Sequence, residues 1–159
     1  MNVPGDHQPM SEGLTKSQAR NIFYGGSLFF FVVFAGLTAH SHLYALNTST
    51  NNNMLTEGVE RGKRVWEKHA CINCHTILGE GAYFAPELGN VFNRYGGRED
   101  AEGAKTAIKE WMKSMPTRIE GRRQMPQFNL SEQELNDIAD FLEWTSKINT
   151  QKWPPNDAG

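Results

Sequence analysis

The feature that most limits the fold of this chain is a long stretch without charge. Residues 21–56 contain no Lys, Arg, Asp or Glu, and from Ile22 to Ala39 nearly every side chain is apolar or small. A helix rises about 1.5 Å per residue, so about 20 such residues cross a hydrocarbon core of roughly 30 Å. The stretch therefore predicts one membrane-spanning helix near the amino terminus.

A cleaved signal peptide and a buried core helix are the alternatives for this stretch. The apolar part of a signal peptide usually has about 7–15 residues and is followed by a small-x-small cleavage site. Here the apolar run is longer, and no clean pair of small residues lies near His40 and His42. We therefore expect an uncleaved anchor.

Basic residues give the anchor a direction. Lys16 and Arg20 lie just before the apolar stretch, and no Lys or Arg follows it until Arg61. Because short cytoplasmic segments are enriched in basic residues, we expect the amino terminus in the cytoplasm. The rest of the chain then lies in the periplasm of a bacterium, attached to the cytoplasmic (inner) membrane.

Composition and length divide the chain into four parts. The polar run NTSTNNN has no apolar pattern and predicts a solvated linker. Sixteen basic and eighteen acidic residues nearly balance, without a Lys/Arg-rich run, so nucleic acid is not an expected partner. We expect a cytoplasmic segment at 1–20, the membrane helix and its exit at 21–46, the linker at 47–55, and one folded domain at 56–159.

Apolar residues at spacings of three and four predict three helices in the folded domain, over residues 56–69, 100–115 and 131–148. Gly62 would let a second helix approach the first one closely, and Pro116 ends the second helix. Ser131 and Glu134 form a capping-box pattern at the start of the third. No long run alternates with period two, so the domain is mainly α-helical. Its long irregular segments enclose a space that a large apolar cofactor would fill.

The motif CINCH, residues 71–75, contains the only two cysteines of the chain and has three interpretations. A redox dithiol usually follows a strand in an alternating strand and helix pattern, which is absent here. A zinc site would need His69 and His75 beside Cys71 and Cys74, which is too crowded for the usual spacing of zinc ligands. We favour covalent attachment of one haem c through Cys71 and Cys74, with His75 as an iron ligand.

A second iron ligand is expected from a methionine, because a thioether stabilises ferrous iron and closes the iron to substrate. Met112 falls on the inward stripe of a predicted helix and is better explained as a core residue. Met115 precedes Pro116 and remains an alternative. Met125 lies in a Met-Pro loop before the last helix, from which it can reach the face opposite His75, and we prefer it.

Three further residues are expected close to the haem. The Pro86 carbonyl follows the motif at a distance suited to accept a hydrogen bond from the second ring nitrogen of His75. Arg122 and Arg123 are candidates to face the haem propionates, although solvated surface arginines are the alternative. His69 is better explained as a packed helix histidine than as a ligand.

One anchor, CINCH and a Met-Pro loop before a final helix resemble membrane-anchored class I cytochrome c domains. The segments GEGAYFAPELGNVF, RRQMPQFNLSEQELNDIADFLEW and SKINTQKWPPN make the chain similar to the cytochrome c subunit of bacterial nitric oxide reductase, from about Ser11 onward. This resemblance implies a subunit that is not catalytic by itself. It implies that a soluble cytochrome c or small copper protein supplies electrons, which pass to a haem b-containing catalytic subunit that reduces nitric oxide to nitrous oxide. It also implies a calcium ion at the subunit interface, close to Gly81 and Tyr83.

Two other functions stay open from the sequence. The chain would equally suit a stand-alone electron carrier tethered to the membrane, or the c-type haem subunit of a terminal oxidase. The near-neutral charge balance fits all three functions, so the partner and the substrate of the complex must separate them.

Overall fold

The structure, a computed structural model, describes residues 13–151 in two compact units that meet between Leu43 and Tyr44. Residues 1–12 of the predicted cytoplasmic segment and residues 152–159 of the predicted domain lie outside this range. Each unit has its own architecture.

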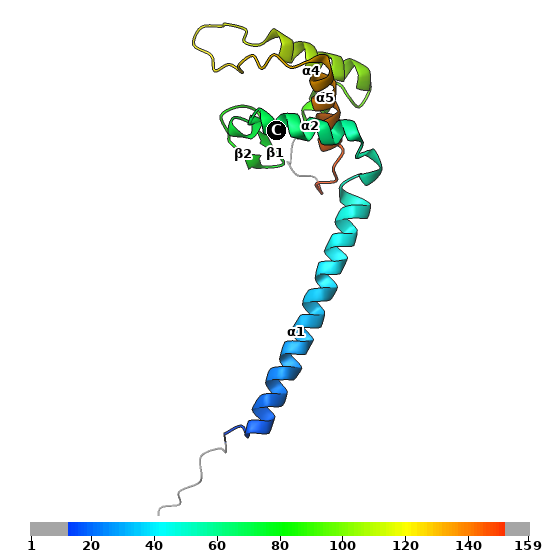
Figure 1. The fold of residues 1–159 in the computed structure, drawn as a ribbon, viewed down its shortest axis with the longest axis vertical. Coiled ribbons are helices and arrows are strands. Elements are labelled where there is room, and N and C mark those ends of the chain that lie inside the picture. Colours follow the sequence, from blue (N-terminus) through cyan, green and yellow to red (C-terminus); the bar gives the residue numbers. More distant parts are fainter. Residues whose placement is uncertain (1–12, 152–159) are drawn as a thin grey trace, which may run out of the picture. The chain divides into compact units, whose positions relative to one another are not determined.

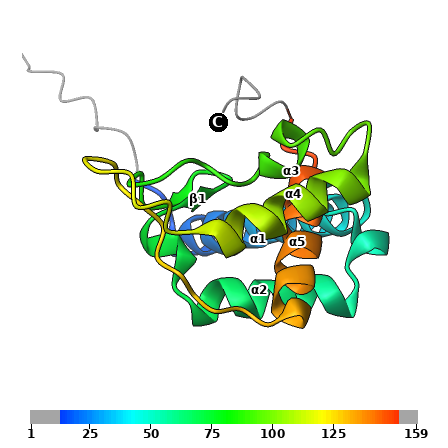
Figure 2. The ribbon, with the colours of Figure 1, turned by 90° about the horizontal axis from the view of Figure 1, so that it is seen from above.

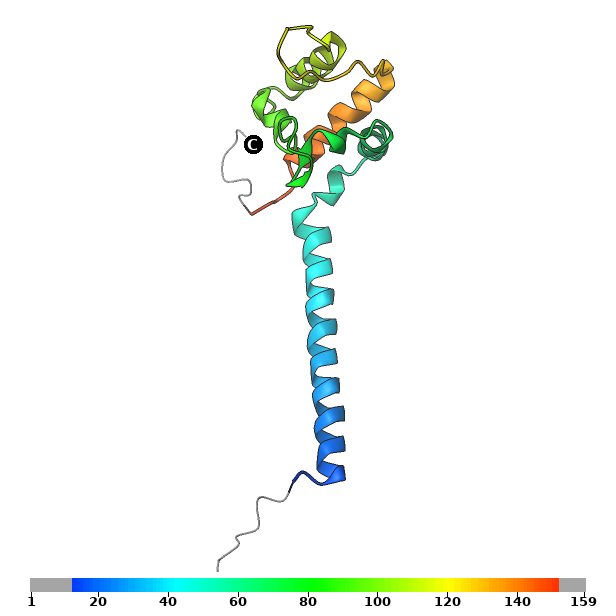
Figure 3. The same ribbon diagram turned by 90° about the vertical axis from the view of Figure 1, so that its left-hand side faces the viewer.

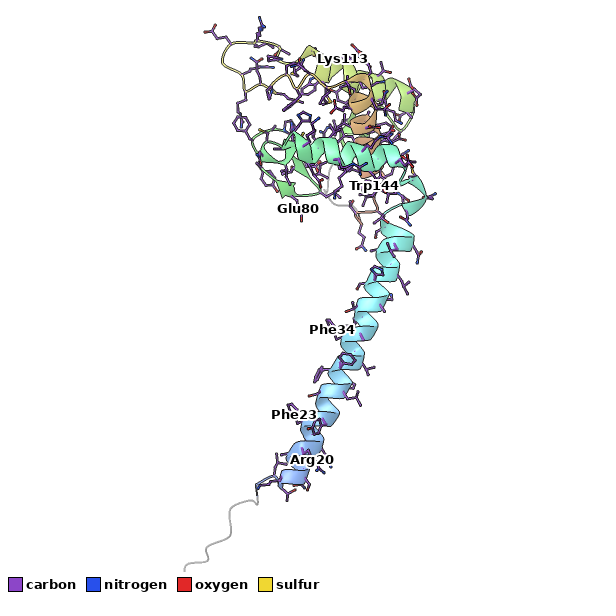
Figure 4. All side chains as sticks on the ribbon, in the orientation of Figure 1. Arg20, Phe23, Phe34, Glu80, Lys113 and Trp144 are labelled. Atoms are coloured by element: carbon purple, nitrogen blue, oxygen red, sulfur yellow. The ribbon has the colours of Figure 1, made fainter. Side chains whose placement is uncertain are left out.

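Helix α1, Lys16–Tyr44, is a single uninterrupted helix (Figures 1 and 3). None of its residues is buried, and aromatic side chains such as Phe23 and Phe34 project outward from it (Figure 4). Among the described residues it is the one helix long and apolar enough to cross a membrane. Apolar side chains exposed along a whole helix are stable only in an apolar surrounding, which agrees with the predicted membrane-spanning helix.

The segment predicted as a solvated linker is partly structured. It contains a π-helical turn, Ala45–Ser49, and a 3-10 turn, Asn52–Met54. The indole Nε1 of Trp144 donates a hydrogen bond of 2.9 Å to the Thr50 carbonyl (Trp144 is labelled in Figure 4), and Asn149 N donates one of 2.8 Å to the Ser49 carbonyl. The structure thus differs from the sequence prediction, because these polar residues bond to the carboxyl end of the last helix.

The centre of the second unit is the packing of helix α2, Glu57–Lys68, against helix α5, Glu132–Ser146, which cross in Figure 2. A Cβ atom placed on Gly62 would lie 1.9 Å from the Asp137 carbonyl oxygen, so only glycine permits this approach. The prediction that Gly62 admits a second helix is confirmed. The Arg61 guanidinium then bonds both oxygens of the buried Asp137 carboxylate at 3.0 Å.

Shorter elements complete the core. Helix α4, Ala101–Ser114, packs on α5, and a single helical turn, α3, Val91–Arg94, packs on both. Strands β1, Thr76–Ile77, and β2, Glu80–Gly81, pair as a two-residue antiparallel hairpin. The three predicted helices and the mainly α-helical class are confirmed; the hairpin and α3 were not predicted. The buried core gathers the side chains of Val59, Val65, Trp66, Val91, Phe92, Ala104, Ile108, Ile138, Phe141 and Leu142.

The capping box at the start of α5 gives a first test of these contacts. Ser131 Oγ accepts a hydrogen bond from Glu134 N at 3.3 Å, and Ser131 N donates one of 3.0 Å to the Glu134 carboxylate. Replacing Ser131 with alanine leaves a backbone donor without its partner, so the free energy of unfolding should fall by about 1 kcal/mol. Chemical unfolding followed by tryptophan fluorescence measures it, since all four tryptophans follow residue 56.

Ser146→Ala is the matched control for this prediction. The Ser146 hydroxyl donates to the Glu143 carbonyl at 2.7 Å, near the other end of the same helix, and satisfies no backbone donor. The variant should therefore change the free energy of unfolding little. If both variants lowered the free energy of unfolding equally, the capping box would not be the cause of the loss in Ser131→Ala.

Candidate haem site

The CINCH motif folds immediately after α2. The chain leaves the helix through His69, turns at Ala70 with φ +50°, and enters a 3-10 turn at Cys71–Asn73. The Cys71 carbonyl accepts hydrogen bonds from Cys74 N at 3.1 Å and His75 N at 2.9 Å. This tight turn brings both thiols and the imidazole to one wall of the domain, and both cysteines are free of a disulfide.

Two cavities meet at this wall. They have volumes of about 430 Å³ and 690 Å³, a range typical of cofactor sites, and both are bordered by Cys71, His75, Pro86, Trp111 and Met125. The smaller cavity is otherwise lined mostly by core side chains, including Trp66, Ile108 and Leu142. Trp111 of α4 borders both cavities and is 40% exposed.

The imidazole of His75 is held in one orientation. His75 is 8% exposed, and its Nδ1 lies 2.7 Å from the Pro86 carbonyl oxygen, which is the hydrogen bond expected from the sequence. A carbonyl accepts only, so Nδ1 is the donor of this bond, and in the neutral ring Nε2 keeps a lone pair. That lone pair is what a metal ion requires, and the hydrogen bond raises the basicity of the ring.

Both thiols border the larger cavity, where each could form a covalent bond. Burial raises the pKa of the Cys71 thiol to about 11. A redox-active or metal-binding cysteine needs a lowered pKa, because the thiolate reacts. Moreover, residues 13–151 contain no group of three His, Cys, Asp or Glu side chains arranged to hold a metal ion. The redox and zinc interpretations therefore fit this arrangement poorly, whereas thiols beside an apolar cavity, an oriented imidazole and a thioether fit a haem.

Of the three candidate methionines, Met125 borders both cavities that His75 borders. Met112 borders only the smaller of them, and Met115, which is 7% exposed, only the larger. Met125 is thus the one of these three methionines that shares both cavities with His75. Its role as a ligand stays a prediction.

Both predicted arginines border the larger cavity. Arg123 also makes a contact that the sequence did not indicate: Nη1 donates a hydrogen bond of 2.7 Å to the Phe84 carbonyl, and its Cζ lies 4.7 Å from the centre of the Phe84 ring. A guanidinium has five N–H donors, so Arg123 retains donors for a further acceptor such as a propionate.

The backbone explains why residue 81 is a glycine, without any metal ion. It lies in β2 at φ +123°, opposite Thr76, and a Cβ atom there would lie 2.2 Å from the His75 carbonyl oxygen. Tyr83 is 80% exposed, with its hydroxyl 3.5 Å from the Gly79 carbonyl. Because the described residues offer no ligand cluster around them, the calcium ion stays a prediction drawn from resemblance.

Three further residues border the two cavities: His69, Arg94 and Tyr95. The His69 ring packs edge-on against Phe128 with 5.2 Å between ring centres, and no partner of its buried Nε2 is found among residues 13–151. His69 is thus packed, as expected, although without the hydrogen bond that would be usual. Arg94 and Tyr95 border the smaller cavity from α3 and its end, and a single turn is too short to show a periodicity.

Comparisons with known proteins identify the domain independently of this geometry. Residues 59–146 match the family model described as Cytochrome c. The chain is 59% identical to the C subunit of nitric oxide reductase from Paracoccus denitrificans over 150 residues, which is 94% of this chain and 100% of the relative. Proteins of the same name from Halomonas halodenitrificans and Stutzerimonas stutzeri are each 58% identical over the same shares of both chains.

Proposed function

The chain belongs to the cytochrome c family and, within it, to the C subunits of nitric oxide reductase; on this premise we propose that it accepts electrons from a soluble periplasmic donor and passes them to the catalytic subunit, which reduces nitric oxide to nitrous oxide. The observation that supports this most directly is the space bordered at once by Cys71, His75 and Met125. The chain itself catalyses no reaction. The donor is a small soluble cytochrome c or copper protein.

The residues at the site have separate tasks in this proposal. The thiols of Cys71 and Cys74 would hold the haem covalently, and His75 Nε2 and the Met125 thioether would be the ligands of its iron. When bound, the haem supplies an iron that changes between the ferric and ferrous states by one electron. Pro86 fixes the tautomer of His75 through its hydrogen bond, and Arg122 and Arg123 bind the propionates.

The surroundings of the site favour electron transfer over catalysis. Two protein ligands leave no iron position for nitric oxide, so the reaction takes place in the partner subunit. The apolar side chains around the smaller cavity exclude water, which penalises the more highly charged ferric state. The thioether of Met125 acts in the same direction, and both raise the reduction potential.

We also propose that α1 anchors the chain in the cytoplasmic membrane, with Lys16 and Arg20 on the cytoplasmic side. The absence of charge over residues 21–56 and the exposed apolar surface of α1 support this. The periplasmic part then includes the segment from Tyr44 onward, because residues 49–51 bond to the end of α5.

Purification from membranes tests the function. A tagged chain is expected to bring down a larger haem b protein in stoichiometric amount, and the complex should consume nitric oxide much faster than oxygen. A free monomeric haem protein would instead indicate a stand-alone electron carrier. Faster consumption of oxygen would indicate a subunit of a terminal oxidase, and either result would overturn the proposal.

Methionine variants test the second ligand. Met125→Leu is expected to remove the thioether-to-iron absorption and to lower the reduction potential by about 59 mV or more, which corresponds to a tenfold loss of preference for ferrous iron in a one-electron couple. Redox titration of the haem-loaded chain measures it. Met112→Leu and Met115→Leu are the matched controls and should keep the absorption. Loss of this absorption in Met115→Leu, but not in Met125→Leu, would assign the ligand to Met115.

A further inference from the structure

We propose that Gln127 is a positioning residue that holds the Met125 thioether in the haem cavity by fixing its loop to the end of α4; the inference rests on the proposed assignment of Met125 as an iron ligand. The residue was not singled out by any sequence pattern. Its side chain lies two positions after Met125 and reaches a different element of the domain.

The Gln127 amide uses all of its hydrogen-bonding groups in this contact. Nε2 donates to the Lys113 carbonyl at 3.0 Å and to the Met115 carbonyl at 2.9 Å, and Oε1 accepts from Asn129 N at 3.0 Å. A primary amide has two N–H donors and one carbonyl, so each of them has a partner here. Such a fully bonded side chain fixes the backbone on either side of it.

The carbonyl groups that receive these bonds need a partner. Helix α4 ends at Ser114, so the Lys113 carbonyl has no main-chain donor within the helix. Residues 115–130 then form a long irregular segment between α4 and α5 (Figure 3). Since this segment has no helix or strand to place it, side-chain contacts decide where Met125 lies.

The other polar side chains beside Met125 do not replace this contact. Gln124 accepts from Arg118 N at 2.6 Å and donates to the Ile119 carbonyl at 2.8 Å, so it closes a turn within the same segment. Arg123 joins the segment to Phe84 on the amino-terminal side of Met125. On the carboxyl-terminal side, Gln127 ties the segment to the end of α4 by hydrogen bonds, beside the ring contact of Phe128 with His69.

A fixed position matters because Met125 has room to leave the cavity. A further cavity of about 280 Å³ is bordered by Met125, Gln127, Leu130 and Leu135, away from His75. Pro126 lies between Met125 and Gln127 and has a restricted φ. A displacement of residue 127 therefore also displaces Met125, because the proline cannot compensate by rotating about φ. Loss of the Gln127 bonds should therefore let the thioether move into this second space.

Carbon monoxide binding measures how often the iron loses its methionine. The full haem-loaded chain is reduced in detergent and mixed with carbon monoxide, and the rate of binding is followed by absorption. Gln127→Leu should bind carbon monoxide at least tenfold faster than the parent chain and show a weaker thioether-to-iron absorption. Gln127→Glu keeps the shape but puts a carboxylate oxygen against two carbonyls, so it should show the same acceleration and provides the test if the leucine variant does not fold.

Gln133→Leu is the control for general destabilisation, because it also loses one amide hydrogen bond, of 2.9 Å to Asp137, on helix α5. It should bind carbon monoxide at the parent rate; an equal acceleration in this variant would overturn the inference. Met125→Leu separates the two proposals. If it leaves carbon monoxide binding unchanged, the ligand assignment fails; if it accelerates binding and both Gln127 variants do not, only the role of Gln127 fails.

Discussion

Replacing Cys71 and Cys74 together with alanine is expected to give a chain that keeps no haem once it is denatured. Each thiol adds across one vinyl group of the haem: sulfur bonds to one carbon, hydrogen to the other, and the double bond is lost without any oxidant. Without the two thioethers, His75 and Met125 hold the group only while the domain is folded. Haem staining of a denaturing gel measures the loss directly.

The single variants sharpen this prediction. Cys71→Ala and Cys74→Ala each leave one thiol on the same cavity wall, so each should retain haem through one bond. A single variant that has incorporated haem should therefore keep more of it after denaturation than the double variant does. Haem that stays attached to the denatured double variant would contradict the assignment, because no other cysteine exists in the sequence.

Gly62→Ala should have the largest effect on folding outside the haem site. The added methyl group would lie 1.9 Å from the Asp137 carbonyl oxygen and 2.6 Å from its carbonyl carbon. These are backbone atoms of α5, which cannot rotate away as a side chain can. Helices α2 and α5 must therefore separate, and this separation also disturbs the ion pair between Arg61 and the buried Asp137 carboxylate. The free energy of unfolding should fall by about 3 kcal/mol or more, although alanine is favoured over glycine in a helix by about 1 kcal/mol. Chemical unfolding of the haem-loaded chain measures this loss.

Gly58→Ala is the matched control on the same helix. A methyl group there would lie 2.7 Å from an oxygen of the Asp140 side chain, which can rotate away, although it pairs with Lys105. The variant should change the free energy of unfolding by no more than about 1 kcal/mol, since the helix propensity gained offsets the adjustment. Similar losses in both variants would show that the Gly62 contact is not the cause.

Whether an element of the fold could be predicted from the sequence depends on how far apart its interacting residues lie along the chain. The helices around Val59, Ile108 and Ile138 follow from spacings of three and four, and Gly62 marked the close crossing in advance. The contacts of the linker could not be predicted, because its partner Trp144 is 94 positions from Thr50. Helix α3 and the β1–β2 hairpin are too short for any periodicity to appear.

At the candidate site, too, local motifs could be predicted and contacts between distant residues could not. CINCH places its cysteines and histidine together by covalent proximity, and the Met-Pro pair stands out by its position before a capped helix. The contact of Arg123 with Phe84 joins residues 39 positions apart, and the bonds of Gln127 depend on where α4 ends. Such contacts follow from the tertiary fold and have no signature along the chain.

The histidine side of the site is held by hydrogen bonds within its own segment, whereas the methionine side is not. Ala82 N bonds to the Ile72 carbonyl, Ala85 N to Cys74, and Leu88 N to Thr76, at 2.7–2.9 Å. Each of these bonds closes a loop of only about a dozen residues, whereas Met125 must be brought across about fifty, at a higher cost in chain entropy. The histidine side can therefore form from its own segment, while the methionine side requires the assembled helices. On partial unfolding, the methionine side should be the first to open and the histidine side the last.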